Sequence, residues 1–130
     1  MTRPDLPALR PLVFDRARGR CEMVNEFAVR CRNQADELHH RLPRRPGGTR
    51  LDVLATAAAR QDELEPRHLA HLAALCSVCH HEVAHGDPKR AVRLGLRVIG
   101  EVRHERWSGE TFYVGPDVEM SRLWPQTDVA

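Results

Sequence analysis

Two adjacent histidines, His39 and His40, open the part of the sequence that is richest in groups able to bind metals or transfer protons. Seven of the eight histidines fall between positions 39 and 85. Neutral imidazole is a common metal ligand, and because its pKa lies near neutrality it also accepts protons readily. On a β-strand, neighbouring side chains point to opposite faces. We therefore expect one histidine of the pair to bind a metal ion and the other to address a substrate.

Four cysteines form a second set of candidate ligands: Cys21, Cys31, Cys76 and Cys79. Two residues separate Cys76 from Cys79, which is the spacing at which two thiolates bind one zinc ion at about 2.3 Å. Cys21 and Cys31 would complete a four-cysteine site, although nine residues lie between them. In a reducing compartment metal binding is commoner than disulfide formation. We predict a structural zinc ion on all four cysteines; a zinc site completed by a histidine, or four free thiols, are the alternatives.

Three further histidines follow the second pair of cysteines directly: His80, His81 and His85. A zinc ion on Cys79 would fix the position of the next residue, His80, so a structural metal could serve a catalytic one. On a helix, His81 and His85 are four residues apart and share a face. The residues alone leave open which of the three would complete a metal site with the histidine pair.

Four arginines follow the histidine pair within ten residues: Arg41, Arg44, Arg45 and Arg50. Arginine holds phosphate through charge-assisted hydrogen bonds, and such contacts position a nucleic acid without reading its sequence. Gly47-Gly48, in the same segment, allows backbone conformations that are closed to other residues. The sequence therefore predicts a phosphate-binding loop here, and a flexible polar loop is the alternative.

The elements that must position these residues are short. In chain order we predict an irregular arm at 1–13, a helix at 12–20, a loop at 21–33, a strand at 37–42, a helix at 51–64, a helix that starts between Cys76 and His80, a helix leading into a strand at 89–98, and a β-hairpin around 107–114. Leu69, Leu72 and Leu75 fit a buried face before the third helix. This mixture of short helices and strands predicts an α+β fold.

The 130 residues are the size of one domain, and we expect a single domain over 1–130 with its core at 16–98 and a hairpin and tail at 99–130. The net charge is +2, but residues 1–50 carry eleven arginines against six acidic residues, and residues 51–130 carry nine basic and twelve acidic residues. A basic front half is typical of a polyanion-binding surface, and a solvated arginine-rich surface is the alternative. Neither a signal peptide nor a run of roughly 20 apolar residues is seen, so we expect a cytoplasmic protein without membrane contact.

The order of these motifs resembles the HNH endonuclease family and is most similar to its small members in actinobacterial phages and prophages. The similarity covers about residues 16–98 and is carried by Cys21 and Cys31, the run ELHHRLPRR at 37–45, Gly47-Gly48 and the run LAALCSVCH at 72–80. The resemblance implies a small ββα-metal core, in which a β-hairpin and a helix surround one catalytic metal, with a four-cysteine zinc knuckle behind it.

The resemblance also implies roles for single residues. It matches His39 to the first metal ligand, His40 to the general base and His80 to the last metal ligand. Colicin-type members add a further histidine one helical turn later, where this chain has Ala84 followed by His85. His85 would serve if the helix were locally distorted; the alternative is that His81 and His85 replace the usual ligands.

One position departs from the family pattern. Nine residues before the last histidine the family has an asparagine that helps orient the base, and this chain has His71 there. Imidazole can donate or accept a hydrogen bond as an amide can, so His71 is expected to take over that role, and the substitution also leaves open a loss of activity. Residues 51–65 would be a helical insertion relative to minimal members.

The activity that the resemblance implies is metal-dependent hydrolysis of DNA phosphodiester bonds. The catalytic ion would be Mg²⁺, Mn²⁺, Ni²⁺ or Zn²⁺, and the substrate would be double-stranded DNA bound with little sequence specificity. The resemblance also suggests a phage terminase as partner. The alternatives are a non-catalytic zinc module that binds nucleic acid and an adaptor of a phage packaging complex with a decayed active site.

Overall fold

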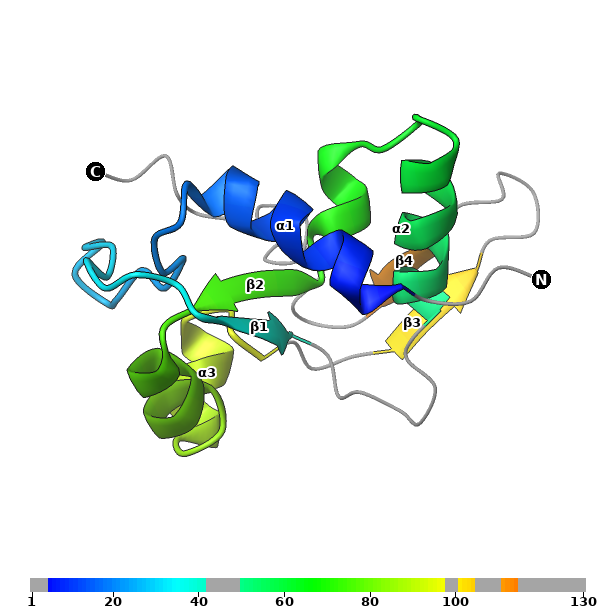
Figure 1. Cartoon of the computed structure of the whole chain (residues 1–130). Coiled ribbons are helices and arrows are strands. Elements are labelled where there is room, and N and C mark those ends of the chain that lie inside the picture. Colours follow the sequence, from blue (N-terminus) through cyan, green and yellow to red (C-terminus); the bar gives the residue numbers. More distant parts are fainter. Residues whose placement is uncertain (1–4, 42–49, 98–100, 105–110, 115–130) are drawn as a thin grey trace.

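The computed structural model describes residues 5–41, 50–97, 101–104 and 111–114 of the chain. Short helices are combined with two separate two-stranded antiparallel sheets, which confirms the predicted α+β class (Figure 1). The elements in chain order are helix α1 (Leu6–Ala17), strand β1 (Glu37–His40), helix α2 (Arg50–Arg60), the 3-10 helix η1 (Pro66–Leu69), strand β2 (Leu72–Leu75), the π-helix η2 (Cys79–Ala84), helix α3 (Pro88–Arg93), strand β3 (Glu101–His104) and strand β4 (Thr111–Val114). Within these ranges, no helix combines the length and the apolar character that crossing a bilayer requires.

Helix α1 begins at Leu6, so the predicted irregular arm is wrong from that residue onward. The Asp5 carboxylate caps the helix by accepting a hydrogen bond from an amide of the first turn at 3.2 Å. Pro7 lies in that first turn, where a missing N–H costs little. The helix buries a face spaced four residues apart: Leu9, Val13 and Ala17. Burial of this face compensates for Pro11 inside the helix.

Strands β1 and β2 form the sheet that carries the histidine pair (Figure 1). His39 lies opposite Ala73, and His40 lies opposite Leu72. Ala73 belongs to a core cluster with residues of η2 and α3, whereas Leu72 belongs to a second cluster with residues of α1 and α2. Because directly opposed residues share a face of the sheet, the two histidines are divided between these two layers.

A helix follows β2, as predicted, but its hydrogen bonding changes after the first residues. From Cys79 to Ala84 it is a π-helix, and at its end the His85 amide donates to the His80 carbonyl at 3.1 Å. Gly86 follows directly; a Cβ there would lie 2.7 Å from the carbonyl oxygen of Glu82, so glycine is required at this position. The π-helix is therefore followed by a position at which only glycine fits.

Strands β3 and β4 pair antiparallel, with Glu101 opposite Val114 and His104 opposite Thr111. Strand β4 lies within the predicted hairpin at 107–114, but its partner β3 lies earlier in the chain than predicted. Residues 105–110 of the predicted hairpin lie outside the described residues.

Candidate metal centres and a buried histidine–aspartate cluster

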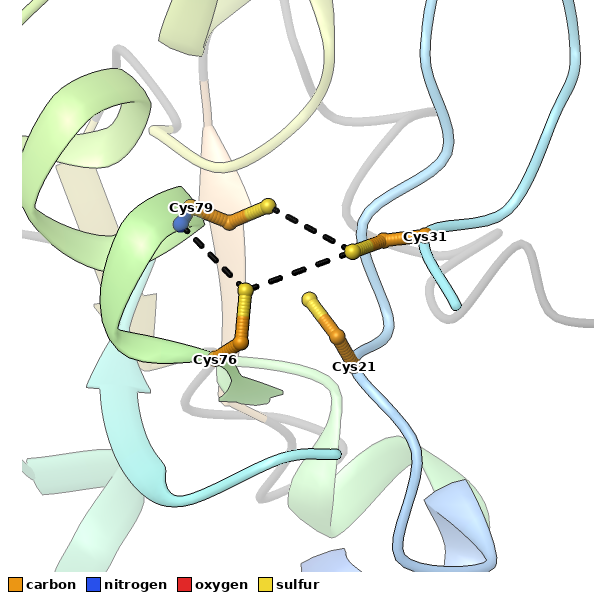
Figure 2. Close-up of side chains that lie close together, drawn as sticks. All are labelled: Cys21, Cys31, Cys76 and Cys79. Atoms are coloured by element: carbon orange, nitrogen blue, oxygen red, sulfur yellow. Dashed lines mark hydrogen bonds between the residues drawn. The ribbon is translucent and has the colours of Figure 1, made fainter. Parts of the chain in front are cut away.

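The four cysteines converge, as predicted, between the loop that follows α1 and the start of the helix that follows β2 (Figure 2). The Sγ atoms of Cys31 and Cys76 are 4.0 Å apart, and those of Cys79 and Cys31 are 3.8 Å apart. Four sulfurs at about 2.3 Å from a tetrahedral zinc ion would be about 3.8 Å from one another. The group could therefore hold a metal ion such as zinc.

The nine-residue spacing between Cys21 and Cys31 is accommodated by hydrogen bonds across the loop. The Cys31 amide donates to the Met23 carbonyl at 2.8 Å. The Arg20 side chain donates to the Cys31 carbonyl at 2.8 Å, and the Arg30 side chain donates to the Cys21 carbonyl at 3.0 Å. Two arginines of the basic front half thus hold the cysteine-bearing backbone rather than a ligand.

The surroundings of the sulfurs favour thiolate at one of them. Interaction with the Cys79 side chain lowers the pKa of Cys21 to about 5, and the same interaction raises the pKa of Cys79. The Cys79 amide also donates to the Cys76 sulfur at 3.4 Å. Because the thiolate is the form that binds a metal, the lowered pKa of Cys21 suits a metal-binding group.

A second candidate centre is formed by His39, His80 and His85, whose ligand atoms all lie within 4.8 Å of one another. His39 comes from β1, and the other two come from η2 and its end. The Nε2 atoms of His80 and His85 are 3.0 Å apart. Two nitrogens on one tetrahedral ion, each at about 2.0–2.1 Å, would be about 3.3 Å apart, so a small shift would bring both onto an ion.

The π-helix explains how His85 reaches this group. In an α-helix, with 3.6 residues per turn, residues five apart would point about 140° away from each other. The i→i+5 bonding of η2 instead places residues five apart on the same side, as the hydrogen bond from the His85 amide to the His80 carbonyl indicates. The position one turn after His80 is therefore taken by His85 and not by Ala84.

Leu96 and Glu37, which the sequence analysis did not single out, determine which imidazole nitrogens remain available to bind a metal. The His39 Nε2–H donates to the Leu96 carbonyl at 2.6 Å, which leaves Nδ1 as its ligand atom. The His80 Nδ1–H donates to the Glu37 carboxylate, which leaves Nε2. Such outer hydrogen bonds orient metal-binding imidazoles in proteins. Glu37 was identifiable from its register, because it precedes His39 by two positions and so shares its face of β1.

His81 belongs to a different group. It contacts the same carboxylate as His80, with its Nε2 3.1 Å from Glu37 Oε1, and its side chain is 65% exposed. Glu37, His80 and His81 form a separate candidate group, which does not include His39. Of the two residues left open by the sequence, His85 is the one that joins His39 and His80.

Two histidines of the second centre, His39 and His85, are favoured in the neutral form that binds metals. Burial lowers the pKa of His39 to about 4. Burial, followed by the nearby charge of His80, also lowers the pKa of His85. Glu37 is kept as a carboxylate, because hydrogen bonding from His80 lowers its pKa.

On the other face of β1, His40 lies against a carboxylate that the sequence analysis missed. Its Nε2 is 3.0 Å from Asp52 Oδ2, and His71 Nε2 is 2.7 Å from Asp52 Oδ1. Asp52 is fully buried, and the His40 side chain is 10% exposed. His71 was expected to help orient His40; their ring centroids are 6.2 Å apart, and the two are linked through Asp52.

The arginines expected to bind phosphate are only partly described. Arg41 is 1% exposed and donates to the Gly95 carbonyl at 2.6 Å and the Ala70 carbonyl at 2.7 Å. Its prediction as a phosphate contact is therefore wrong, because its guanidinium is used inside the protein to hold the end of β1. Arg44 and Arg45 lie outside the described residues, and of Arg50 only the backbone, in α2, is described.

Comparison with known proteins finds no matching family model, no matching curated protein and no matching solved structure.

Proposed function

We propose that this protein is a metal-dependent endonuclease of the HNH type that hydrolyses phosphodiester bonds in DNA. The observation that carries the proposal is that β1 presents its two histidines to different groups. His39 joins His80 and His85 on one face of the strand, and His40 lies with a buried carboxylate on the other. The order of two antiparallel strands followed by a helix is also the order that the sequence resemblance implies. The proposal places a metal ligand and a base at adjacent positions of one strand.

The three histidines would hold the catalytic divalent ion. Three protein ligands leave a coordination position for substrate or water, as in catalytic metal sites, and imidazole ligands favour Mn²⁺, Ni²⁺ or Zn²⁺ over Mg²⁺. When bound, the ion would supply Lewis-acid stabilisation of the scissile phosphate and of the leaving 3′ oxygen. Glu37 and the Leu96 carbonyl would keep two of the imidazoles aimed at it.

His40 would be the general base. Its Nε2–H is donated to Asp52, so the lone pair of Nδ1 is the one that can accept a proton. A water oxygen attacks phosphorus while its proton passes to Nδ1, and the bond from phosphorus to the 3′ oxygen breaks. The leaving oxygen takes a proton from solvent, and His40 later returns its proton to solvent. The products are a 5′ phosphate and a 3′ hydroxyl.

Zinc on the four cysteines would have a structural role. Cys79 is followed directly by His80, so an ion that fixes Cys79 also fixes the start of η2. Cys76, Cys79 and Val83 lie in the same core cluster as Ala73 of β2, which couples this centre to the sheet.

The proposed substrate is double-stranded DNA, bound with little sequence specificity. Phosphate contacts from Arg44, Arg45 and Arg50 would hold the backbone in register without reading bases. A cytoplasmic location, expected from the sequence, and a phage terminase as partner complete the proposal; the partner is supported by the sequence resemblance alone.

Replacing His85 by alanine should weaken Ni²⁺ binding to the zinc-loaded protein by at least about 100-fold, because it removes one of three ligands. Replacing His81 by alanine should weaken it by less than about 10-fold, because only a hydrogen bond to Glu37 is lost. Titration calorimetry measures both. A larger loss for His81→Ala would identify Glu37, His80 and His81 as the metal site and contradict the proposed one.

The proposal is tested by nicking of supercoiled plasmid DNA with added Mn²⁺ or Ni²⁺, with and without a chelator. Cleavage that depends on the added ion, together with two metal equivalents per chain, supports it. One equivalent per chain and no cleavage with any divalent ion would overturn it and favour a non-catalytic zinc module that binds nucleic acid.

A further inference from the structure

A buried carboxylate lies between two histidines that come from distant parts of the chain. Asp52 is in the first turn of α2, His40 is the last residue of β1, and His71 immediately precedes β2. Asp52 Oδ1 is 2.7 Å from His71 Nε2 and 3.2 Å from His40 Nε2, and Oδ2 is 3.0 Å from His40 Nε2. A carboxylate accepts but does not donate, so both imidazoles must present an Nε2–H to it.

Burial makes this contact costly unless it is fully paired. Asp52 is 0% exposed and His71 is 2% exposed, so neither can exchange its hydrogen bonds for water. A charged group that is buried in this way needs hydrogen-bond donors, and the two Nε2–H groups supply them. The arrangement therefore holds both imidazoles in one tautomer more firmly than a solvent-exposed pair would.

The backbone around the cluster is anchored separately. The Thr56 hydroxyl donates to the Asp52 carbonyl at 2.8 Å and accepts from the Asp5 amide at 2.9 Å, which ties α2 to the start of α1. The Arg41 amide donates to the His71 carbonyl at 2.9 Å, which ties the end of β1 to His71. These contacts fix the distance between the elements without involving the carboxylate.

We propose that Asp52 is the positioning residue for His40: it holds the proton on Nε2 and so presents the Nδ1 lone pair to the attacking water, and His71 holds Asp52 in place. This inference rests on the proposed nuclease function for its effect on rate. The carboxylate also stabilises the imidazolium that forms when His40 takes the proton from water. Asp52 itself does not touch the substrate.

The informative variant is Asp52→Asn, which keeps the size of the side chain and can still form hydrogen bonds. It removes the charge, and its amide can donate to His40 Nε2 and so favour the other tautomer. We expect kcat for plasmid nicking to fall by about 100-fold or more, with KM and Ni²⁺ affinity within about twofold of wild type. Thr56→Val is the matched control, because it loosens the same helix without changing the carboxylate.

A second readout is independent of activity. Long-range ¹H–¹⁵N spectra of the imidazoles, recorded where they are neutral, should show His40 protonated at Nε2 in the wild type and in Thr56→Val, and a shift toward Nδ1–H in Asp52→Asn. If the wild type cleaves no DNA, the proposed function fails and these spectra alone decide the positioning role. A wild-type His40 protonated at Nδ1, or an Asp52→Asn variant with unchanged tautomer, or equal losses of kcat in Asp52→Asn and Thr56→Val, would overturn the inference.

Discussion

Replacing His40 by alanine should lower the rate of metal-dependent DNA cleavage by about 10²–10⁴-fold, the contribution typical of a general base. The metal content should not change, because His40 lies on the face of β1 away from His39, His80 and His85 and belongs to none of the three candidate metal-binding groups of the described residues. Plasmid nicking under metal saturation gives the rate, and elemental analysis gives the number of bound ions.

Two further variants make this test specific. His40→Asn keeps a donor for Asp52, so it should fold like the wild type and still lack a base for the attacking water. His68→Ala is the control. The His68 Nδ1 accepts a hydrogen bond from the Glu65 amide at 2.8 Å, and His68 belongs to none of the candidate metal-binding groups of the described residues. His68→Ala should cleave like the wild type. Full cleavage by His40→Ala or His40→Asn would exclude His40 as the base.

The sequence was most informative where chemistry and spacing coincide. The two-residue gap of Cys76 and Cys79 indicated a shared ligand site, and the structure places all four sulfurs together. The alternation of side chains on a strand predicted that His39 and His40 would face opposite ways, and the two core layers on either side of β2 bear this out. Both inferences depend on local geometry, which a short stretch of sequence specifies well.

The sequence was least informative where a contact joins distant elements or where the backbone departs from its regular form. The sequence did not distinguish Asp52 from other acidic residues, yet it is the shared partner of His40 and His71, which lie 12 and 19 residues away in the chain. The π-helical turn that brings His85 to His80 has no signature in residue spacing, since five-residue separation predicts opposite faces of an α-helix.

Arg41 shows a third limit, since charge alone does not tell whether a side chain faces solvent. Because it follows His40 directly, Arg41 was predicted to belong to a phosphate-binding loop, but its guanidinium donates to the carbonyls of Ala70 and Gly95 in the interior. In the sequence, an arginine that donates to backbone carbonyls looks the same as one that binds phosphate. Only the three-dimensional contacts of Arg41 with Ala70 and Gly95 distinguish the two roles.

Replacing Cys79 by serine should remove both metal centres, whereas His85→Ala should remove only the histidine one. Structural zinc contributes about 10–16 kcal/mol of apparent binding free energy in small zinc domains, and the whole stability of a domain is about 5–15 kcal/mol. Loss of one thiolate ligand therefore leaves Cys79→Ser largely unfolded at 25 °C. Thermal unfolding followed by circular dichroism and elemental analysis after dialysis measure the two effects.

The matched control is Val78→Ser, which changes the neighbouring residue of the same knuckle. Val78 is 51% exposed and lies between Cys76 and Cys79, so its loss should alter neither metal content nor unfolding temperature appreciably. A Cys79→Ser protein that stays folded and retains two ions would show that neither the fold nor the bound zinc depends on Cys79. A protein that loses zinc but keeps the histidine-bound ion would show that His80 is positioned by the core around Ala73 and Val83 rather than by the adjacent cysteine. We expect both ions to be lost in Cys79→Ser because Cys79 and His80 are adjacent in the chain. The histidine centre therefore depends on the cysteine centre, whereas the cysteine centre does not depend on the histidines.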